Sequence, residues 1–231
     1  MSSWTSRTKS RISIMRYSII MFAFAILFIG FVAIFSTKPT VIIVPGYGFN
    51  LTPDDYSYII NDLSLRGYTV KKYYPSFNDI SNYQKLIEAW SAGIGALSDN
   101  KKVIVIGHSV GGAVAMHFCA TDRRCVAEVN LDGGPIQNLP IPVPNLYIQG
   151  EIGEYCDSSC IAGRKLAELI TAESRGNKIF LPNLKHMDFT DFALKPPHSL
   201  VIQGYFGSIN PKTGFQEIDN EIDSFLHNLK S

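Results

Sequence analysis

The chain has 231 residues, of which 46% are hydrophobic, 12% aromatic and 18% charged, and its formal net charge at pH 7 is +1. This length fits one domain or two small ones, with enough hydrophobic residues for a substantial core. The balanced charge argues against the broad basic surface that binds nucleic acid, so we expect no nucleic-acid partner.

A long apolar segment lies near the N-terminus. Tyr17–Phe35 reads YSIIMFAFAILFIGFVAIF, and no charged residue lies between Arg16 and Lys38. About twenty such residues, at roughly 1.5 Å each along a helix, span the hydrocarbon core of a bilayer. We therefore expect residues 1–38 to form a cytoplasmic tail and a transmembrane signal-anchor, and residues 39–231 to form the folded domain. A cleaved signal peptide is the alternative, although its apolar region is usually shorter, about 7–15 residues.

The charges beside this segment predict its orientation. Four basic residues precede it, namely Arg7, Lys9, Arg11 and Arg16. Only Lys38 follows it closely. Because basic residues favour the cytoplasmic side of a membrane helix, the chain from residue 39 onward is expected outside the cytoplasm. The sequence thus predicts a single-pass membrane protein with an extracytoplasmic domain, or a secreted or exported one if the segment is cleaved.

The four cysteines fall into two local pairs. Cys119 and Cys125 are six positions apart, and Cys156 and Cys160 are four apart. Outside the cytoplasm two local disulfides are conceivable, but four cysteines allow three pairings, and buried free thiols are the alternative. Neither pair has the spacing of a zinc site, so no metal is expected.

After Pro39, short apolar runs alternate with longer amphipathic ones. The runs that predict strands are Val41–Val44, Tyr68–Tyr73, Lys102–Ile106, Val126–Leu131, Asn145–Gln149 and Lys178–Leu181. The patterns that predict helices lie at about 54–66, 81–98, 110–121, 162–175 and 216–229. Strands rich in β-branched residues that alternate with helices indicate an α/β fold, with a mostly parallel sheet covered by helices on both faces.

The segment around Ser109 has the pattern of a nucleophile turn. Gly107–Gly111 reads GHSVG, directly after the strand VIVI and directly before a predicted helix. In this context G-x-S-x-G places a serine on a strained strand-to-helix turn, where its hydroxyl is exposed at the carboxyl end of the sheet. The glycines let neighbouring backbone pass closely. A glycine-rich turn with an idle serine is the alternative.

A serine nucleophile needs two backbone donors for the oxyanion. The loop after the first predicted strand, VIIVPGYGF at 41–49, is in the expected place. We expect the amides of Tyr47 and Val110 to be these donors. An ordinary turn at the end of the strand is the alternative reading of this loop.

A general base is expected among the histidines near the end of the last strand. Three of the five histidines lie in the nucleophile turn at 107–111 (the nucleophile elbow) or in predicted helices: His108, His117 and His227. Of the remaining two, His186 follows the predicted strand KIFLPN by a few residues, whereas His198 lies in a Pro-Pro-His loop. We therefore favour His186.

The acid that orients the base is less clearly marked. Asp132 follows the strand Val126–Leu131 and precedes two glycines. Carboxylates also follow the next strand, the more widespread place for this acid: Glu151, Glu154 and Asp157. An aspartate before two glycines is also common as a turn-capping residue, so the residues alone leave the choice open.

Three motifs in this order resemble one known family. They are GHSVGG at 107–112, Leu131-Asp132 at a strand end, and HMDFTDF at 186–192. The resemblance is to the plasma-type platelet-activating factor acetylhydrolases, calcium-independent phospholipases and esterases with the α/β-hydrolase fold. It covers about 40–231 and implies that Asp132 is the acid and His186 the base. Pro45 stands where those relatives have a histidine, and the first half of this chain is much shorter than theirs.

The sequence therefore predicts a serine carboxylic-ester hydrolase that uses Ser109, His186 and Asp132 and needs no cofactor. A short chain leaves little room for a lid, so we expect an open site for short or truncated acyl esters, including phospholipids. Phe49, Phe189 and Phe206 are expected in its walls. The alternatives are another hydrolase of the same fold (lipase, thioesterase, polyesterase or chlorophyllase-like) and a non-catalytic binding protein.

Overall fold

The computed structural model describes residues 38–76, 82–135, 137–153, 156–194 and 205–229. The chain divides into two units, Met1–Lys38 and Pro39–Ser231, and the second contains the fold. No helix among the described ranges is long and apolar enough to cross a membrane. The predicted anchor at Tyr17–Phe35 lies outside those ranges, as do His198 and Glu154.

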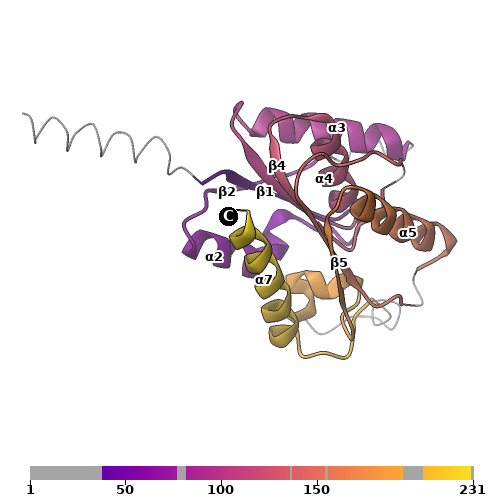
Figure 1. The fold of residues 1–231 in the computed structure, drawn as a ribbon. Helices are drawn as coiled ribbons and strands as arrows, with labels where there is room; N and C mark the ends of the chain where they lie inside the picture. Colours follow the sequence, from indigo (N-terminus) through magenta and orange to yellow (C-terminus); the bar gives the residue numbers. More distant parts are fainter. Residues whose placement is uncertain (1–37, 77–81, 136, 154–155, 195–204, 230–231) are drawn as a thin grey trace, which may run out of the picture. The chain divides into compact units, whose positions relative to one another are not determined.

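A parallel sheet forms the centre of the second unit (Figure 1). Its strands, in the order in which they lie side by side, are β2 (Val70–Lys72), β1 (Thr40–Val44), β3 (Val103–His108), β4 (Cys125–Leu131), β5 (Asn145–Gly150) and β6 (Asn177–Leu181). Every neighbouring pair is parallel. From β1 the chain first adds β2 on one side and then β3 on the other, so the strand order reverses between β1 and β3. In open α/β sheets, ligand-binding sites form at such a point.

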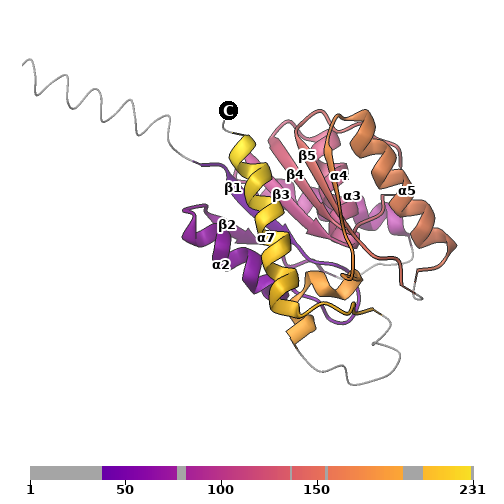
Figure 2. The same cartoon turned by 60° about the horizontal axis from the view of Figure 1, so that its bottom comes forward.

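Helices cover both faces of this sheet (Figures 1 and 2). The α-helices are α2 (Ser57–Leu65), α3 (Tyr83–Leu97), α4 (Val110–Thr121), α5 (Ser158–Glu173) and α7 (Pro211–Asn228). Short 3₁₀ turns are η1 (Pro53–Tyr56), η2 (His186–Phe189) and η3 (Asp191–Leu194). Helices α2 and α7 enclose one apolar core with the sheet, and α3, α4 and α5 enclose the other.

The strand sequences explain the two cores. In β3, Ile104 and Ile106 face the core of α2 and α7, whereas Val103 and Val105 face the core of α3, α4 and α5. Each of these four side chains is at most 1% exposed. A strand with apolar residues at every position is stable only when both of its faces are covered, as they are here.

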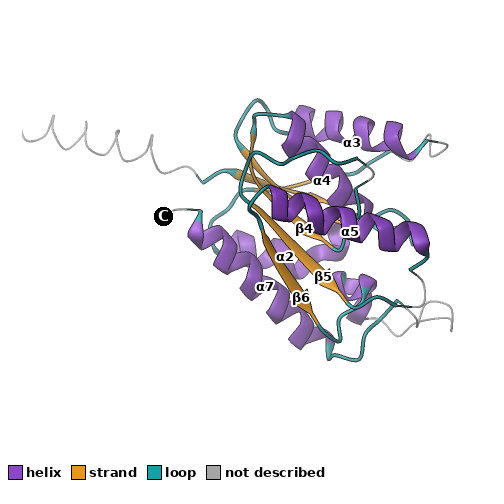
Figure 3. Ribbon diagram, turned by 45° about the vertical axis from the view of Figure 1, so that its right-hand side comes forward, coloured by secondary structure: helices purple, strands orange, loops and turns teal. Residues whose placement is uncertain are grey.

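The parallel arrangement brings the functional segments to one edge. Figure 3 shows β4, β5 and β6 running in the same direction, so that their carboxyl ends share one edge of the sheet. Ser109 follows β3, Asp132 follows β4 and His186 follows β6. Residues more than 70 positions apart in the chain, such as Ser109 and His186, therefore lie at the same edge.

Both local cysteine pairs form disulfides. Cys119 in α4 is bonded to Cys125 at the start of β4, and Cys156 is bonded to Cys160 in the first turn of α5. The first disulfide joins a helix to the strand that follows it. The second joins the segment after β5 to the start of α5, close to the carboxyl edge of the sheet.

Candidate active site

Three side chains form a continuous chain of hydrogen bonds at the carboxyl edge of the sheet. The distance from Ser109 Oγ to His186 Nε2 is 2.8 Å, and the distance from His186 Nδ1 to Asp132 Oδ2 is 2.7 Å. Ser109 and His186 are the serine and the histidine that the sequence favoured, and Asp132 is the acid that the family resemblance implied. A hydroxyl, an imidazole and a carboxylate in this order are able to move a proton from the serine to the imidazole.

The turn that carries Ser109 has a conformation that ordinary residues avoid. Ser109 has φ 56° and ψ −121° and immediately precedes α4. A Cβ at Gly107 would lie 2.0 Å from the Gly111 carbonyl oxygen, and one at Gly111 would lie 2.4 Å from the Val44 carbonyl oxygen. Only glycine fits at these two positions, which explains why the turn has the GHSVG sequence.

The loop after β1 lies directly against this turn. A Cβ at Gly46 would lie 3.1 Å from Ser109 Cβ, so the backbone just before Tyr47 touches the serine. Val110 follows Ser109 as the first residue of α4. Of the two residues expected to supply oxyanion donors, Val110 is therefore adjacent to the serine in the chain, and Tyr47 follows a glycine that packs against the serine. The Tyr47 side chain is 38% exposed, and only its backbone amide is relevant to this role.

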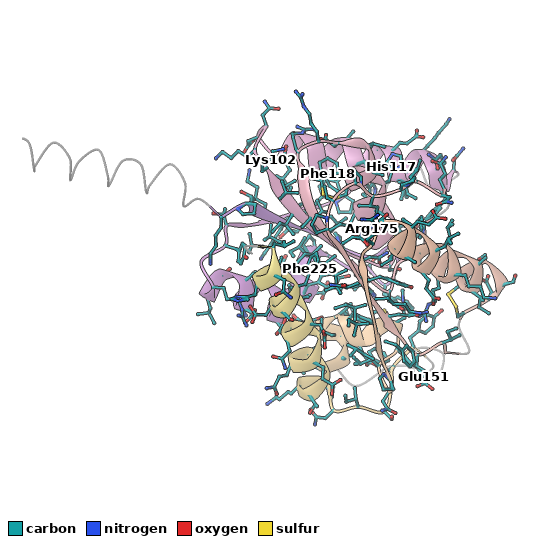
Figure 4. All side chains as sticks on the ribbon, in the orientation of Figure 1. Lys102, His117, Phe118, Glu151, Arg175 and Phe225 are labelled. Atoms are coloured by element: carbon teal, nitrogen blue, oxygen red, sulfur yellow. A yellow bond between two sulfur atoms is a disulfide. The ribbon has the colours of Figure 1, made fainter. Side chains whose placement is uncertain are left out.

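Asp132 is the carboxylate that contacts the histidine. It is 3% exposed, and its Oδ1 accepts a hydrogen bond of 3.1 Å from the Gly150 amide. Glu151 lies exposed beyond the end of β5 (Figure 4). Asp157 instead caps α5, where its Oδ1 accepts from the Cys160 amide. Of the carboxylates that the sequence left open, Asp132 therefore has the geometry of the orienting acid.

A buried arginine, which the sequence analysis did not identify, binds the same carboxylate. The guanidinium of Arg164 in α5 donates from Nη2 to Oδ2 of Asp132 and from Nη1 to the Gly150 carbonyl, the latter at 3.0 Å. Arg164 is only 2% exposed. An arginine in an amphipathic helix is usually read as a surface residue, so its sequence position gave no sign of this contact.

A second, buried chain of hydrogen bonds connects the segments that carry the site residues. The Gly46 amide donates to Tyr56 Oη at 3.0 Å, and Tyr56 Oη lies 2.8 Å from His108 Nδ1. His108 Nε2 lies 2.8 Å from the carbonyl oxygen of His186. Because a carbonyl only accepts, His108 carries its proton on Nε2 and accepts from the Tyr56 hydroxyl at Nδ1. This chain joins the loop after β1, the elbow and the segment of the histidine base.

His108 is held neutral in this position. Burial lowers its pKa well below the ordinary histidine value, and the nearby His186 and Arg164 lower it further. The hydrogen bond to the His186 carbonyl raises the pKa of His108, but by less than burial lowers it. The histidine of the elbow thus has a structural role, as a neutral hydrogen-bond bridge.

A cavity of about 660 Å³ opens beside Ser109. Most of its lining is contributed by the start of α5, by the turn after β4 and by single residues of other segments: Tyr83, Ser109, Val110, Asp132, Gly134, Pro135, Ser159, Cys160, Ala162, Gly163, Arg164, Leu166, His186 and Tyr205. Because this cavity is open to solvent beside the serine, a substrate can reach Ser109 directly.

The three phenylalanines expected in the walls have different places. Phe49 is 42% exposed, and its ring lies edge-on to Tyr205 at 5.4 Å. Phe189 is fully buried, and its ring stacks on that of His108 with the ring centres 5.9 Å apart. The expectation that Phe189 lines the substrate site is therefore wrong. Phe206 is half-buried, and its neighbour Tyr205 lines the cavity instead.

Within the residues that the structure describes, no group of three or more histidine, cysteine, aspartate or glutamate side chains is arranged to hold a metal ion.

No family model and no curated protein matches the sequence. Solved structures, in contrast, superimpose on its fold. A ferulic acid esterase from Streptomyces cinnamoneus superimposes with a TM-score of 0.64 at 20% identity, over 81% of this chain and 66% of that chain. The mouse alpha/beta hydrolase domain-containing protein 10 gives a TM-score of 0.57 at 12% identity, over 83% and 91% of the two chains.

A dienelactone hydrolase-like promiscuous phosphotriesterase, P91 from metagenomic libraries, gives a TM-score of 0.54 at 16% identity, over 81% of this chain and 87% of that one. At such identities the likeness shows the fold and leaves the activity to be argued from the site. The second unit therefore has the α/β-hydrolase fold, as the sequence predicted.

The neutral state of His108 makes the stability of the protein depend on pH. In the unfolded chain this histidine takes up a proton near pH 6.5, whereas in the folded protein it does so only at much lower pH. Below about pH 6.5 the unfolded state binds the additional proton, so this group lowers stability as the pH falls and has no effect above that range.

His108→Gln removes this proton but retains a side chain that can accept from Tyr56 and donate to the His186 carbonyl. Between pH 7 and pH 5, the free energy of unfolding of the wild type should fall more steeply than that of the variant, by up to about 1.4 kcal/mol per pH unit. Urea unfolding over this range measures the difference. Parallel curves for the two proteins would contradict a neutral, buried His108.

Proposed function

We propose that this protein is a serine carboxylic-ester hydrolase in which Ser109 is the nucleophile, His186 the general base and Asp132 the orienting acid. The observation that carries the proposal is the chain of contacts from Ser109 Oγ to His186 to Asp132, at 2.8 and 2.7 Å. The esterases and hydrolases among the structures of similar fold support it.

The geometry suggests how the reaction would proceed. His186 Nε2 takes the proton of Ser109 while Oγ attacks the carbonyl carbon of the ester, and the carbonyl oxygen becomes an oxyanion. The amides of Tyr47 and Val110 would bind this oxyanion, beside the N-terminus of α4. His186 then gives its proton to the leaving alcohol. A water molecule, activated by His186, hydrolyses the acyl-enzyme and restores Ser109.

The cavity has room for a small ester. A space of about 660 Å³ that is open to solvent accommodates a short acyl group together with its alcohol. The resemblance of three sequence motifs to those of platelet-activating factor acetylhydrolases favours short or truncated acyl chains, including those of phospholipids. We therefore propose that short-chain esters are the substrates of this site.

We also propose that the apolar segment 17–35 holds this domain on the outer side of a membrane. The basic residues before the segment and the two disulfides of the domain support this placement, since disulfides persist in oxidising compartments.

Ser109→Ala tests the nucleophile. With p-nitrophenyl acetate we expect kcat to fall by about 10⁴-fold or more, because no other group takes over the covalent step. Ser64→Ala, which changes an exposed serine of α2, is the matched control and should keep the wild-type rate. Equal rates for Ser109→Ala and Ser64→Ala would rule out Ser109 as the nucleophile.

A series of p-nitrophenyl esters tests the substrate class. With acyl chains from acetyl to palmitoyl, kcat/KM should be highest for the short esters, since the cavity has room for a short chain without rearrangement. The same protein should release the short sn-2 acyl group of a truncated phospholipid. Preferential hydrolysis of long-chain triacylglycerol over acetyl esters would show instead that the enzyme is a lipase.

A further inference from the structure

Asp132 binds two groups through one oxygen. Its Oδ2 is 2.7 Å from His186 Nδ1 and also accepts from Arg164 Nη2. The side chain of Asp132 is fully buried, and that of Arg164 is 3% exposed. A serine triad requires only the aspartate and the histidine, so the guanidinium is an additional charge placed directly at the acid.

The backbone is shaped to bring α5 this close. A Cβ at Gly134 would lie 2.8 Å from the carbonyl carbon of Gly163, so the turn after Asp132 and the second turn of α5 touch through two glycines. Arg164 follows Gly163 directly and therefore lies next to the carboxylate. The Cys156–Cys160 disulfide and the Asp157 cap hold the first turn of the same helix.

The contact with Arg164 changes what the aspartate does to the histidine. A carboxylate beside an imidazole favours the protonated imidazolium, and a positive charge beside it disfavours that form. Because the Asp132 and Arg164 side chains are buried, water screens their charges only weakly. The guanidinium therefore opposes part of the effect of Asp132 on His186, while it also compensates the cost of burying the carboxylate.

Other titratable groups also lie near His186 in the chain or in space. His108, whose ring centre is 4.7 Å from that of His186, is neutral, and α7 contributes Ile218 and Ile222 to the apolar core beneath the turn. The remaining titratable groups nearby are Lys185, Asp188, Asp191 and Tyr205. Asp188 is engaged by the Lys185 and Gly207 amides, and Asp191 by the Ser57 amide.

We propose that Arg164 is a positioning residue of the site, which fixes the Asp132 carboxylate and offsets part of its charge, so that His186 stays deprotonated to lower pH. This inference rests on the proposed function, since His186 is active as a base only when it is neutral. Arg164 acts through Asp132 and does not need to touch the substrate. The result is an esterase whose activity extends further into the acid range than a triad without the arginine would allow.

Arg164→Gln tests this role by two readouts. The first is the NMR titration of the His186 imidazole, measured in a Ser109→Ala background so that no turnover is needed. The midpoint should rise by about one pH unit or more when the guanidinium is removed. The second readout is the acid limb of kcat/KM for p-nitrophenyl acetate in protein with Ser109 intact, which should move in the same direction.

Two further variants separate charge from packing. Arg164→Lys keeps a positive charge and should restore part of the shift. Arg124→Gln removes another arginine–aspartate pair, with Asp122, at the opposite end of β4, and should leave the midpoint of His186 unchanged. A lower stability of Arg164→Gln with the wild-type midpoint would show that Arg164 is only a packing residue, which would overturn the proposal.

If Arg164→Gln does not fold, Asp132→Asn/Arg164→Gln, in which neither charge is buried alone, is compared with Asp132→Asn. The proposal expects a higher midpoint in the double variant, and equal midpoints would overturn it. The titration is independent of turnover. An active wild type with an unmoved midpoint therefore refutes the role of Arg164 alone, whereas a wild type without esterase activity refutes the proposed function.

Discussion

The close passage of backbone at the end of β3 is the constraint on which the site depends. Ser109 occupies a turn with positive φ, and the carbonyl groups of Val44 and Gly111 lie where side chains of ordinary residues would be. This packing brings the loop after β1 against the nucleophile turn and directs α4 away from it. Any side chain at Gly107 or Gly111 would separate these segments and disassemble the site, whatever the other residues were.

The remaining parts of the site are joined to that turn by buried polar contacts. Tyr56 and His108 connect the loop after β1 to the segment of His186. Asp132 connects the end of β4 to His186 and, through the Gly150 amide, to the end of β5. Buried polar groups of this kind are costly unless all are paired, so a shift of one segment would disturb the others. The result is a pre-organised site at the edge of a rigid sheet.

The sequence predicted the parts of this arrangement that have local patterns. Every predicted strand is present, although Tyr68–Tyr73 is reduced to Val70–Lys72. The strands could be predicted because runs of β-branched residues between turns are a distinctive pattern. The region 162–175 was expected as a helix, but α5 begins at Ser158 because Asp157 caps it. GHSVG and His186 were identified because each lies at or soon after the end of a strand, where parallel topology brings residues together, whereas Asp132 was favoured over other carboxylates after strands only by the family resemblance.

Contacts made across the fold had no such signal. Arg164 and Tyr56 lie in helical segments with nothing local to show that they are buried against the site. Phe189 was expected in the wall of the cavity, but its side chain is fully buried and its ring stacks on His108, a packing contact that no local pattern indicates. The apolar segment 17–35 lies outside the described residues, so its role as an anchor stays a prediction.

Reaction with a fluorophosphonate tests the central claim, that Ser109 is an activated nucleophile, most directly. Such a probe phosphonylates a serine only where a base removes its proton, and fluoride leaves. After labelling of the folded protein and proteolysis, mass spectrometry should find the adduct on Ser109, with esterase activity lost in proportion to labelling. A folded protein that takes up no label, or takes it up at another residue with Ser109 unmodified, would contradict the account.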